Sequence, residues 1–348
     1  MNKSIFRIWN KLILSIFIFS FLHSAFCKPV NLSKIVYGDN QFVAIGWIGS
    51  YVKKTMRSII LTSTNGITWT KQNFETNQFL NGIVYGDKKF VAVGGYGTII
   101  TSSDGIHWSK QKIPILKILD FPTRHYGISA IAYGNNKFVA VVGFGKVLIS
   151  SNSGITWIGY NIKTSSIFYG ITYGDNQFVA VGDLWPRSGS SIFSSTKGII
   201  WTKKYSGRNN NILWGITYGD GKFVAVGKHS TILTSSNGGI TWTKQNFGIK
   251  PGRCGSKTYL WGITYGDKKF VAVGGGIVLT SSNGINWKEI KFPQTSFSGI
   301  TYGDGKFVAV GMGYNTTTHH RCGIIITSQN EKIWKSIYIT SHDISKLK

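Results

Sequence analysis

A chain of 348 residues has room for two or three ordinary domains or for one large all-β domain. It contains 43 glycines and only 6 prolines, and 14% of its residues are aromatic but only 15% charged, which is typical of many short strands and tight turns rather than long surface helices. The hydrophobic fraction of 42% excludes a disordered chain, and a formal net charge of +26 favours acidic partners.

The first 27 residues are predicted to be a secretory signal peptide. A basic start precedes an apolar run over residues 12–22, and small residues stand close to Cys27. The run is too short for a comfortable membrane span, so we expect cleavage and a secreted or periplasmic protein. An uncleaved anchor and lipid attachment at Cys27 are the alternatives. Cleavage removes three positive charges and lowers the net charge to +23; these charges are Lys3, Arg7 and Lys11.

The rest of the chain is a repeat with three marks, each of which occurs seven times. A Tyr-Gly turn begins at Tyr37, Tyr85, Tyr133, Tyr173, Tyr218, Tyr265 and Tyr302. Five residues after each tyrosine stands Phe42, Phe90, Phe138, Phe178, Phe223, Phe270 or Phe307. Each copy ends at Trp69, Trp108, Trp157, Trp201, Trp242, Trp287 or Trp334. Periods of 37 to 48 residues between tyrosines are typical of propellers and solenoids.

Each repeat contains four strand-like runs, and repeat five shows them at 214–218, 223–227, 231–235 and 240–244. Apolar residues lie on both faces of these runs, so each sheet must be covered on both sides, as in a radial stack of blades. The sequence therefore predicts an all-β, seven-bladed β-propeller of four-stranded antiparallel blades over residues 31–340. Residues 341–348 are expected to form a short tail.

The turn between the third and fourth runs carries a recognisable motif. Ser150-x-Asn152-x-Gly154-x-Thr156-Trp157 resembles the Asp-box of BNR-repeat and sialidase-type propellers. The copy from Ser235 to Trp242 matches it equally well. Among exported propellers, the style of the repeat is similar to the photosystem II assembly factor family, which implies a non-catalytic seven-bladed propeller. The Asn closes the turn through backbone N–H groups, so we interpret these motifs as scaffold rather than as a site.

Loop lengths divide the propeller into two faces. The first-to-second and third-to-fourth turns share one face, the bottom, and hardly vary in length. The second-to-third loops and the connections between repeats share the top face. There, the spacing from Phe to the motif serine ranges from 11 residues in repeat six to 21 in repeats one and seven. Because function is usually carried on variable loops of a rigid scaffold, the top face is the predicted working face.

All arginines of the chain after the signal peptide fall in top loops, and we predict that they bind carboxylate or phosphate groups. They are Arg57, Arg124, Arg187, Arg208, Arg253 and Arg321. A second cue is the position two residues before the apolar Ile of each first strand, which we expect at the top mouth of the central channel. It reads Ser33, Asn81, Ser129, Tyr169, Trp214, Trp261 and Ser298. Tyr169, Trp214 and Trp261 are predicted binding residues, with packing between repeats as the alternative.

We predict no catalytic residues, no cofactor and no metal site, although enzyme chemistry stays open as an alternative. A sialidase-like hydrolase needs carboxylates, and the top loops offer only Glu75, Asp120 and Asp183. A polysaccharide lyase could use a histidine base in those loops; the candidates are His125, His229, His319 and His320. A metal at His319-His320-Arg321-Cys322 lacks a second ligand cluster. Cys254 and Cys322 are a candidate disulfide.

These observations favour a non-catalytic exported binding propeller, with an enzyme as the less favoured interpretation.

 The expected partner is an acidic polysaccharide or an acidic protein segment, with an anionic membrane surface as a further alternative and nucleic acid excluded by the export signal. The expected oligomeric state is a monomer. The rival interpretation is a sialidase-like glycoside hydrolase or a polysaccharide lyase.

Overall fold

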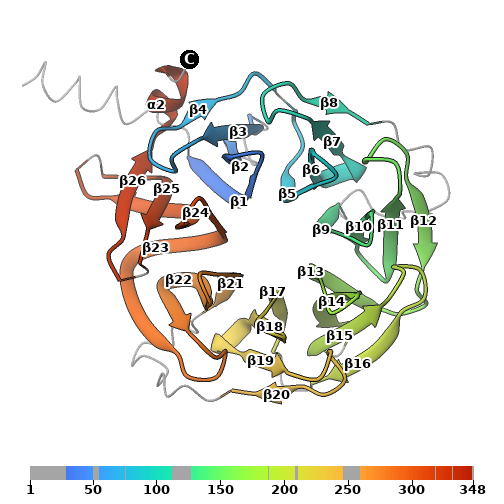
Figure 1. Cartoon of the computed structure of the whole chain (residues 1–348). Coiled ribbons are helices and arrows are strands. Elements are labelled where there is room, and N and C mark those ends of the chain that lie inside the picture. Colours follow the sequence, from blue (N-terminus) through green and yellow to red (C-terminus); the bar gives the residue numbers. More distant parts are fainter. Residues whose placement is uncertain are drawn as a thin grey trace, which may run out of the picture.

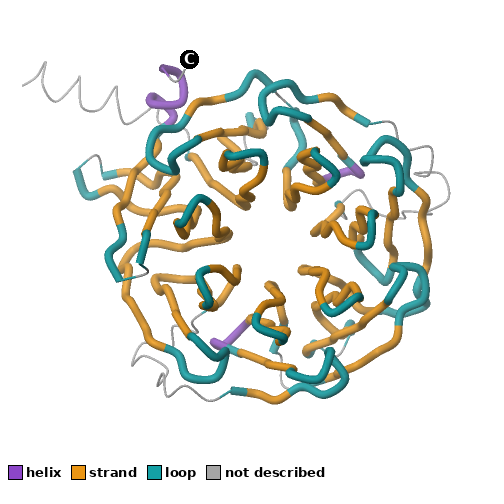
Figure 2. The backbone as a smooth tube through the Cα atoms, viewed as in Figure 1, coloured by secondary structure: helices purple, strands orange, loops and turns teal. Residues whose placement is uncertain are grey.

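The computed structural model describes residues 29–49, 55–74, 76–111, 127–186, 188–207, 211–245, 259–317, 319–330 and 332–346. Within these ranges, antiparallel sheets stand side by side around a central channel (Figure 1). The first strand of each repeat lies beside the channel and the last strand lies at the rim. Loops and turns connect the strands all around the ring (Figure 2). No helix in the described ranges is long and apolar enough to cross a membrane.

Five of the sheets have four strands in sequence order. The first two contain β1 (Val30–Gly38), β2 (Gln41–Ile48), β3 (Arg57–Ser63) and β4 (Thr70–Lys71), then β5 (Leu80–Gly86), β6 (Lys89–Gly94), β7 (Ile99–Ser102) and β8 (Ser109–Lys110). The next two contain β9 (Ile128–Gly134), β10 (Lys137–Val142), β11 (Lys146–Ser150) and β12 (Ile158–Asn161), then β13 (Ser166–Gly174), β14 (Gln177–Leu184), β15 (Ser190–Ser195) and β16 (Thr202–Ser206). The fifth contains β17 (Leu213–Gly219), β18 (Lys222–Gly227), β19 (Ile232–Ser235) and β20 (Thr243–Lys244). Single 3-10 turns, η1 (Gly95–Gly97) and η3 (Lys228–Ser230), connect the second and third strands of repeats two and five.

The sixth sheet has six strands and holds two copies of the repeat. Its strands are β21 (Leu260–Gly266), β22 (Lys269–Ser281), β23 (Lys288–Gly303), β24 (Lys306–Asn315), β25 (His320–Ser328) and β26 (Lys335–Ile339). The expected count of seven separate blades is therefore wrong, because the described chain forms six sheets. The reason is one additional strand pairing: Gly276, at φ +70°, turns the chain within β22, and Gly275 pairs with Ser296 of β23, so repeats six and seven share one sheet.

The bottom turns bind each repeat to the next. In all seven Tyr-Gly turns the two central residues have positive φ, as a two-residue hairpin turn requires, and Asp, Asn and Gly accept this conformation. The glycine that follows each tyrosine lies against the tyrosine ring of the next repeat, from Gly38 against Tyr85 to Gly303 against Tyr37. Each tyrosine also packs on the phenylalanine of its own repeat, with ring centroids 4.6 to 4.8 Å apart. These contacts run around the whole ring and close it.

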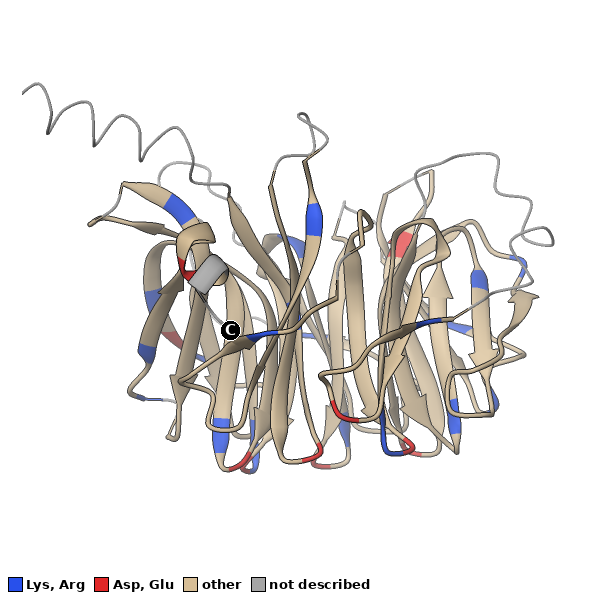
Figure 3. Ribbon diagram, turned by 90° about the horizontal axis from the view of Figure 1, so that it is seen from above, with Lys and Arg blue, Asp and Glu red and all other residues tan. Residues whose placement is uncertain are grey.

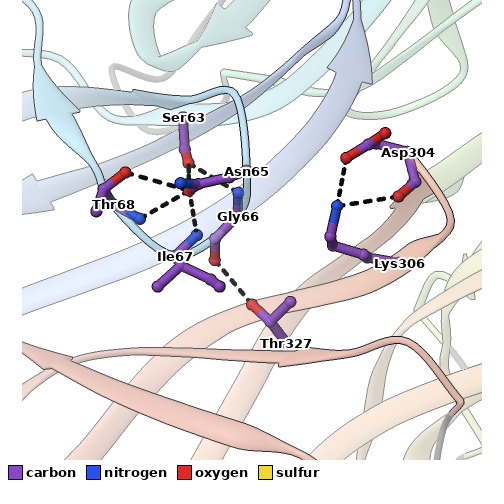
Figure 4. Close-up of polar contacts among 8 residues, drawn as sticks. All are labelled: Ser63, Asn65, Gly66, Ile67, Thr68, Asp304, Lys306 and Thr327. Atoms are coloured by element: carbon purple, nitrogen blue, oxygen red, sulfur yellow. Dashed lines mark hydrogen bonds and ion pairs between the residues drawn. The ribbon is translucent and has the colours of Figure 1, made fainter.

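The turns between third and fourth strands have the hydrogen bonds expected of scaffold. In repeat three, Oδ1 of Asn152 accepts from the backbone N–H of Thr156 at 2.9 Å, and Nε1 of Trp157 donates to the carbonyl of Gly154 at 2.9 Å. In repeat one, Asn65 makes the corresponding turn bonds (Figure 4). These turns confirm the scaffold interpretation of the motif, although membership of the BNR family is not shown.

The two ends of the chain meet without sharing a sheet among the described strands, since β1 pairs with β2 and β26 pairs with β25. The Thr327 hydroxyl donates to the carbonyl of Gly66 across the junction at 2.8 Å (Figure 4). Val30, Val310 and Ile325 belong to one buried cluster there. The expected tail continues as α2 (Ser341–Lys346), and its Ile344, 4% exposed, belongs to the same cluster. Burial of apolar surface thus closes the ring.

Candidate functional site

A cavity of about 550 Å³ occupies the top mouth of the central channel. Its lining includes one residue from each repeat, the position two before the apolar Ile; these seven mouth residues are Ser33, Asn81, Ser129, Tyr169, Trp214, Trp261 and Ser298. The sequence-based placement of this position is confirmed. Its role in binding is not tested by the geometry and stays a prediction.

A β-bulge explains why these side chains reach the mouth. In all seven repeats the pairing of the first two strands shifts register at the mouth residue, which is left without a partner in the ladder. A bulge bends the strand and turns one side chain in a new direction. The mouth residue therefore does not have to match a cross-strand neighbour, and its identity is free to differ between repeats.

Aromatic rings form one side of the mouth. Trp214 and Trp261, which we call the tryptophan pair, are stacked with centroids 4.1 Å apart and an interplanar angle of 23°. Tyr259 packs against both rings, at 5.5 Å from Trp214 and 5.7 Å from Trp261. Both tryptophans stay partly exposed and line the cavity, as Tyr169 does. The same rings thus pack between repeats and line the cavity, while their role in binding stays a prediction.

The polar side of the mouth is tied to its neighbours. The Ser33 hydroxyl lies 2.9 Å from the carbonyl of Leu80 in repeat two, and Nδ2 of Asn81 donates to the carbonyl of Ile128 in repeat three at 3.1 Å. These bonds hold the rim of the cavity by side-chain contacts between successive repeats. A partly preformed cavity needs less ordering when a ligand binds.

Lys34 is the residue of this site that sequence reasoning missed. Its Nζ donates to the carbonyl of Ser298 at 3.0 Å and lies 3.5 Å from the carbonyl of Trp261, residues that are 264 and 227 positions away in the chain. The side chain keeps some contact with the channel but is surrounded by protein, and burial lowers the pKa of its amine to about 8.

A signal for Lys34 was present in the repeat alignment. The position directly before the channel Ile is small in the other six repeats: Gly82, Ala130, Gly170, Gly215, Gly262 and Gly299. Space explains this, because a Cβ at Gly299 would lie 2.9 Å from Cα of Lys34. A lysine in a column of glycines is therefore an exception that comparison of the repeats could have found.

Below the mouth, the channel contains a second, smaller cavity of about 170 Å³. It shares Lys34, Tyr169 and Trp214 with the mouth and is lined further by the channel isoleucines and their small neighbours. We call the junction of the two cavities, at Lys34, the throat. Below the throat, no charged residue of the described chain lines the passage.

Of the six predicted arginines, the structure describes two, both exposed at the top. The prediction that these two lie in loops is wrong, since Arg57 is the first residue of β3 and Arg321 is the second residue of β25, and neither lines the mouth cavity. Four lie outside the described residues: Arg124, Arg187, Arg208 and Arg253. The arginine face therefore stays a prediction.

The carboxylates lie mainly on the opposite face, and Figure 3 shows most acidic residues along the lower edge of the ring. In three bottom turns a lysine pairs with the aspartate of its own turn: Lys222 with Asp220 at 2.6 Å, Lys269 with Asp267 at 3.9 Å, and Lys306 with Asp304. At the top, Asp183 is 5% exposed and accepts from the backbone N–H of Gly189 at 2.8 Å. Glu75 and Asp120 lie outside the described residues, and so does His125.

The remaining candidates lie apart from the mouth. Cys322 is buried on β25 opposite Gly313, and its partner in the predicted disulfide, Cys254, lies outside the described residues. His229 contacts Asn211 at 3.3 Å, and His319 contacts Tyr314 at 3.4 Å. Within the described ranges, no group of three or more His, Cys, Asp or Glu is placed to hold a metal.

Comparison with known proteins identifies the fold. No family model and no curated protein matches the chain. A solved structure described as "YCF48 bound to D1 peptide" is 16% identical, with 82% of this chain and 89% of that chain covered and a TM-score of 0.58. YCF48 from Cyanidioschyzon merolae is 13% identical, with 88% and 97% covered and a TM-score of 0.61. The computationally designed Ika8 protein is 10% identical, with 84% and 96% covered and a TM-score of 0.51.

At these identities the likeness shows a β-propeller and nothing finer. The expected similarity to the photosystem II assembly factor family is confirmed at the level of the fold.

Proposed function

We propose that this chain is an exported, non-catalytic binding propeller that holds an acidic protein segment on its top face, across the mouth of the channel. The observation that carries the proposal is the mouth cavity, where seven repeats converge on a stacked tryptophan pair next to a lysine amine. Its volume of about 550 Å³ lies within the usual range of ligand pockets, roughly 300 to 1,000 Å³.

Aromatic faces and a cation at one place suit a peptide with acidic character. The rings offer large apolar contact at low cost in conformational entropy, and the positive charge selects carboxylates. The predicted arginines would extend this preference around the rim, because their planar groups pair with carboxylates through two hydrogen bonds. The net charge of the chain would speed the approach of an acidic segment.

A protein segment is favoured over the other acidic partners by one comparison. The solved propeller described as "YCF48 bound to D1 peptide" has the same fold and is described as binding a peptide. An acidic polysaccharide and an anionic membrane surface therefore become outcomes of the test. Hydrolysis is not favoured, since the described residues that line the mouth include no carboxylate for acid–base work.

The test is calorimetric titration of the purified protein with a Glu-rich peptide, the same peptide with Gln at each Glu, and a heparin fragment. We expect the Glu-rich peptide to bind, and Trp214→Ala and Trp261→Ala each to weaken it about tenfold or more, through loss of ring contact. Trp185→Ala is the matched control, since Trp185 is 50% exposed in another top loop and does not line the mouth.

Equal binding of the Gln peptide, or an unchanged affinity in both mouth variants, would contradict the proposal. Tighter binding of heparin than of the Glu-rich peptide would point to a polysaccharide. Export is tested separately by sequencing the N-terminus of the protein purified from its host. We expect it to begin shortly after residue 27.

A further inference from the structure

The throat of the channel carries a positive charge at one place in the ring. In six repeats the residue before the channel Ile is Gly or Ala, and in repeat one it is Lys34. The side chain reaches from β1 to the backbone of repeats six and seven, where Nζ meets the carbonyls of Trp261 and Ser298. The ammonium therefore lies beside the backbone that carries one member of the tryptophan pair.

The contacts of the ammonium leave room for an anion. A lysine ammonium has three N–H donors, and two carbonyl oxygens receive two of them. Neither acceptor carries a full negative charge. The described residues that line the two cavities include no Asp or Glu. The charge thus lacks a carboxylate partner in the described walls, although burying a charge is costly unless it is paired.

The shape of the channel decides where a ligand group would stop. The mouth above Lys34 has about 550 Å³ and the passage below it about 170 Å³, lined by isoleucines and small residues. A planar apolar group fits against the tryptophan pair in the mouth, and a charged tip would end at the throat. Apart from Lys34, the described residues that line the lower cavity include no charged side chain that could pair with the ligand charge.

We propose that the throat is a carboxylate-binding site, in which Lys34 pairs with one carboxylate of a ligand and the tryptophan pair covers the apolar part next to it. This inference rests on the proposed function and names its anchoring residue. The carboxylate can come from a peptide C-terminus or from a Glu or Asp side chain. Both sources present the same group to the amine.

The probe is phenylacetate, which has an aromatic ring beside a carboxylate, compared with phenylacetamide, its neutral isostere. Binding is followed by tryptophan fluorescence, since the tryptophan pair lines the site. In the wild-type protein we expect phenylacetate to bind about tenfold or more tightly than phenylacetamide. Lys34→Met should remove this preference while binding of phenylacetamide changes little.

The matched control is Lys110→Met, because Lys110 is exposed on β8 at the rim and its loss changes the net charge equally. It should keep the full preference for phenylacetate. Circular dichroism and thermal unfolding verify that Lys34→Met folds, as we expect from a methionine of similar length in this apolar place. Equal affinities of the two probes for the wild type, or a preference that persists in Lys34→Met, would overturn the inference.

Peptides then separate the two sources. One comparison is between a peptide with a free C-terminus and its C-terminal amide, and the other is between a peptide with an internal Glu and the same peptide with Gln. The change that lowers the affinity for the wild-type protein, but not the affinity for Lys34→Met, identifies the carboxylate in the throat. If the Glu-rich peptide binds and no carboxylate depends on Lys34, the inference fails while the proposed function stands. If phenylacetate shows the Lys34-dependent preference and the Glu-rich peptide does not bind, the proposed function fails and the throat site stands.

Discussion

The bottom and top faces of the ring are built from the same seven repeats but obey different constraints. At the bottom, all seven Tyr-Gly turns have the same length, positive φ at both central residues and the same ring contact to the next repeat. At the top, the mouth residue is Ser in three repeats, Asn in one, Tyr in one and Trp in two. The bottom turns are therefore alike in all seven repeats, whereas the mouth residues at the top differ between repeats.

The difference follows from what each residue contacts. A bottom glycine touches the ring of the next tyrosine, so any change there disturbs two repeats at once. A mouth residue stands at a bulge and faces a cavity, so its side chain can vary without loss of strand pairing. Variation is therefore concentrated where a ligand can reach. The following substitutions test that division, from the largest expected effect to the smallest.

The largest effect is expected at the bottom, from Gly174→Ala. A Cβ at Gly174 would lie 2.2 Å from Cγ of Tyr218, so the ring must move and the contact to the next repeat is lost. We expect the free energy of unfolding to fall by roughly 3 kcal/mol. Gly221→Ala is the control: nothing lies within 4 Å of the added Cβ, and only its φ of +69° costs about 1 kcal/mol. Chemical denaturation measures both, and equal losses would contradict the ring-contact argument.

Lys34→Met should stabilise the fold at neutral pH. Burial lowers the pKa of the amine to about 8 from 10.5, so the folded state disfavours the charged form. This cost is fully present below about pH 8 and disappears as pH rises above 10.5, because between these values the unfolded chain binds more protons. We expect Lys34→Met to raise the free energy of unfolding by about 1 to 3 kcal/mol at pH 7. The gain is smaller if water in the channel solvates the amine of the wild type.

Denaturation of both proteins from pH 7 to pH 10.5 measures this difference. The stability of the wild type should rise relative to Lys34→Met over that range. Tyr169 is the other titratable residue that lines the mouth in the described chain, and it is common to both proteins. A constant difference across the range would show that the amine is not the group that titrates.

Asn152→Ala removes the turn bonds of repeat three. Oδ1 of Asn152 accepts from the backbone N–H of Thr156 at 2.9 Å and from the hydroxyl of Ser150 at 3.0 Å. Because the turn is exposed, water replaces part of these bonds, and we expect a loss of about 1 kcal/mol. Asn152→Asp retains the acceptor and should stay within about 0.5 kcal/mol of the wild type. Thermal unfolding distinguishes the two, and similar losses would argue against the turn bonds.

The smallest effect on stability is expected from Arg57→Ala combined with Arg321→Ala. Both side chains are exposed on the top face, so the free energy of unfolding should change by less than about 0.5 kcal/mol. Retention on a heparin resin should nevertheless end at lower salt, since two cations of the predicted binding face are lost. The control pair Lys222→Ala and Lys306→Ala removes two bottom lysines that pair with their own turn aspartates. Equal shifts for both pairs would contradict a functional top face.

Much of the fold could be predicted because each repeat contains the residues that determine its own turns and strands. A two-residue turn that begins with Asp or Asn and continues with Asn, Gly or Lys, flanked by Tyr and Phe five residues apart, fixes a hairpin locally, and seven copies imply a ring. The blade count was wrong because strand pairing between Gly275 and Ser296 crosses from one repeat to the next. No local pattern marks that contact, since it depends on how two chain segments meet in space.

The candidate site divides in the same way. The sequence by itself determined the ring of repeats, the bottom turns and the set of residues at the mouth, because those features repeat with a fixed spacing. Only the tertiary structure decided that Trp214 and Trp261 stack, and that Lys34 meets the carbonyls of Trp261 and Ser298. Closure of the ring brings these distant residues to one channel, and their contacts depend on that closure rather than on any segment alone.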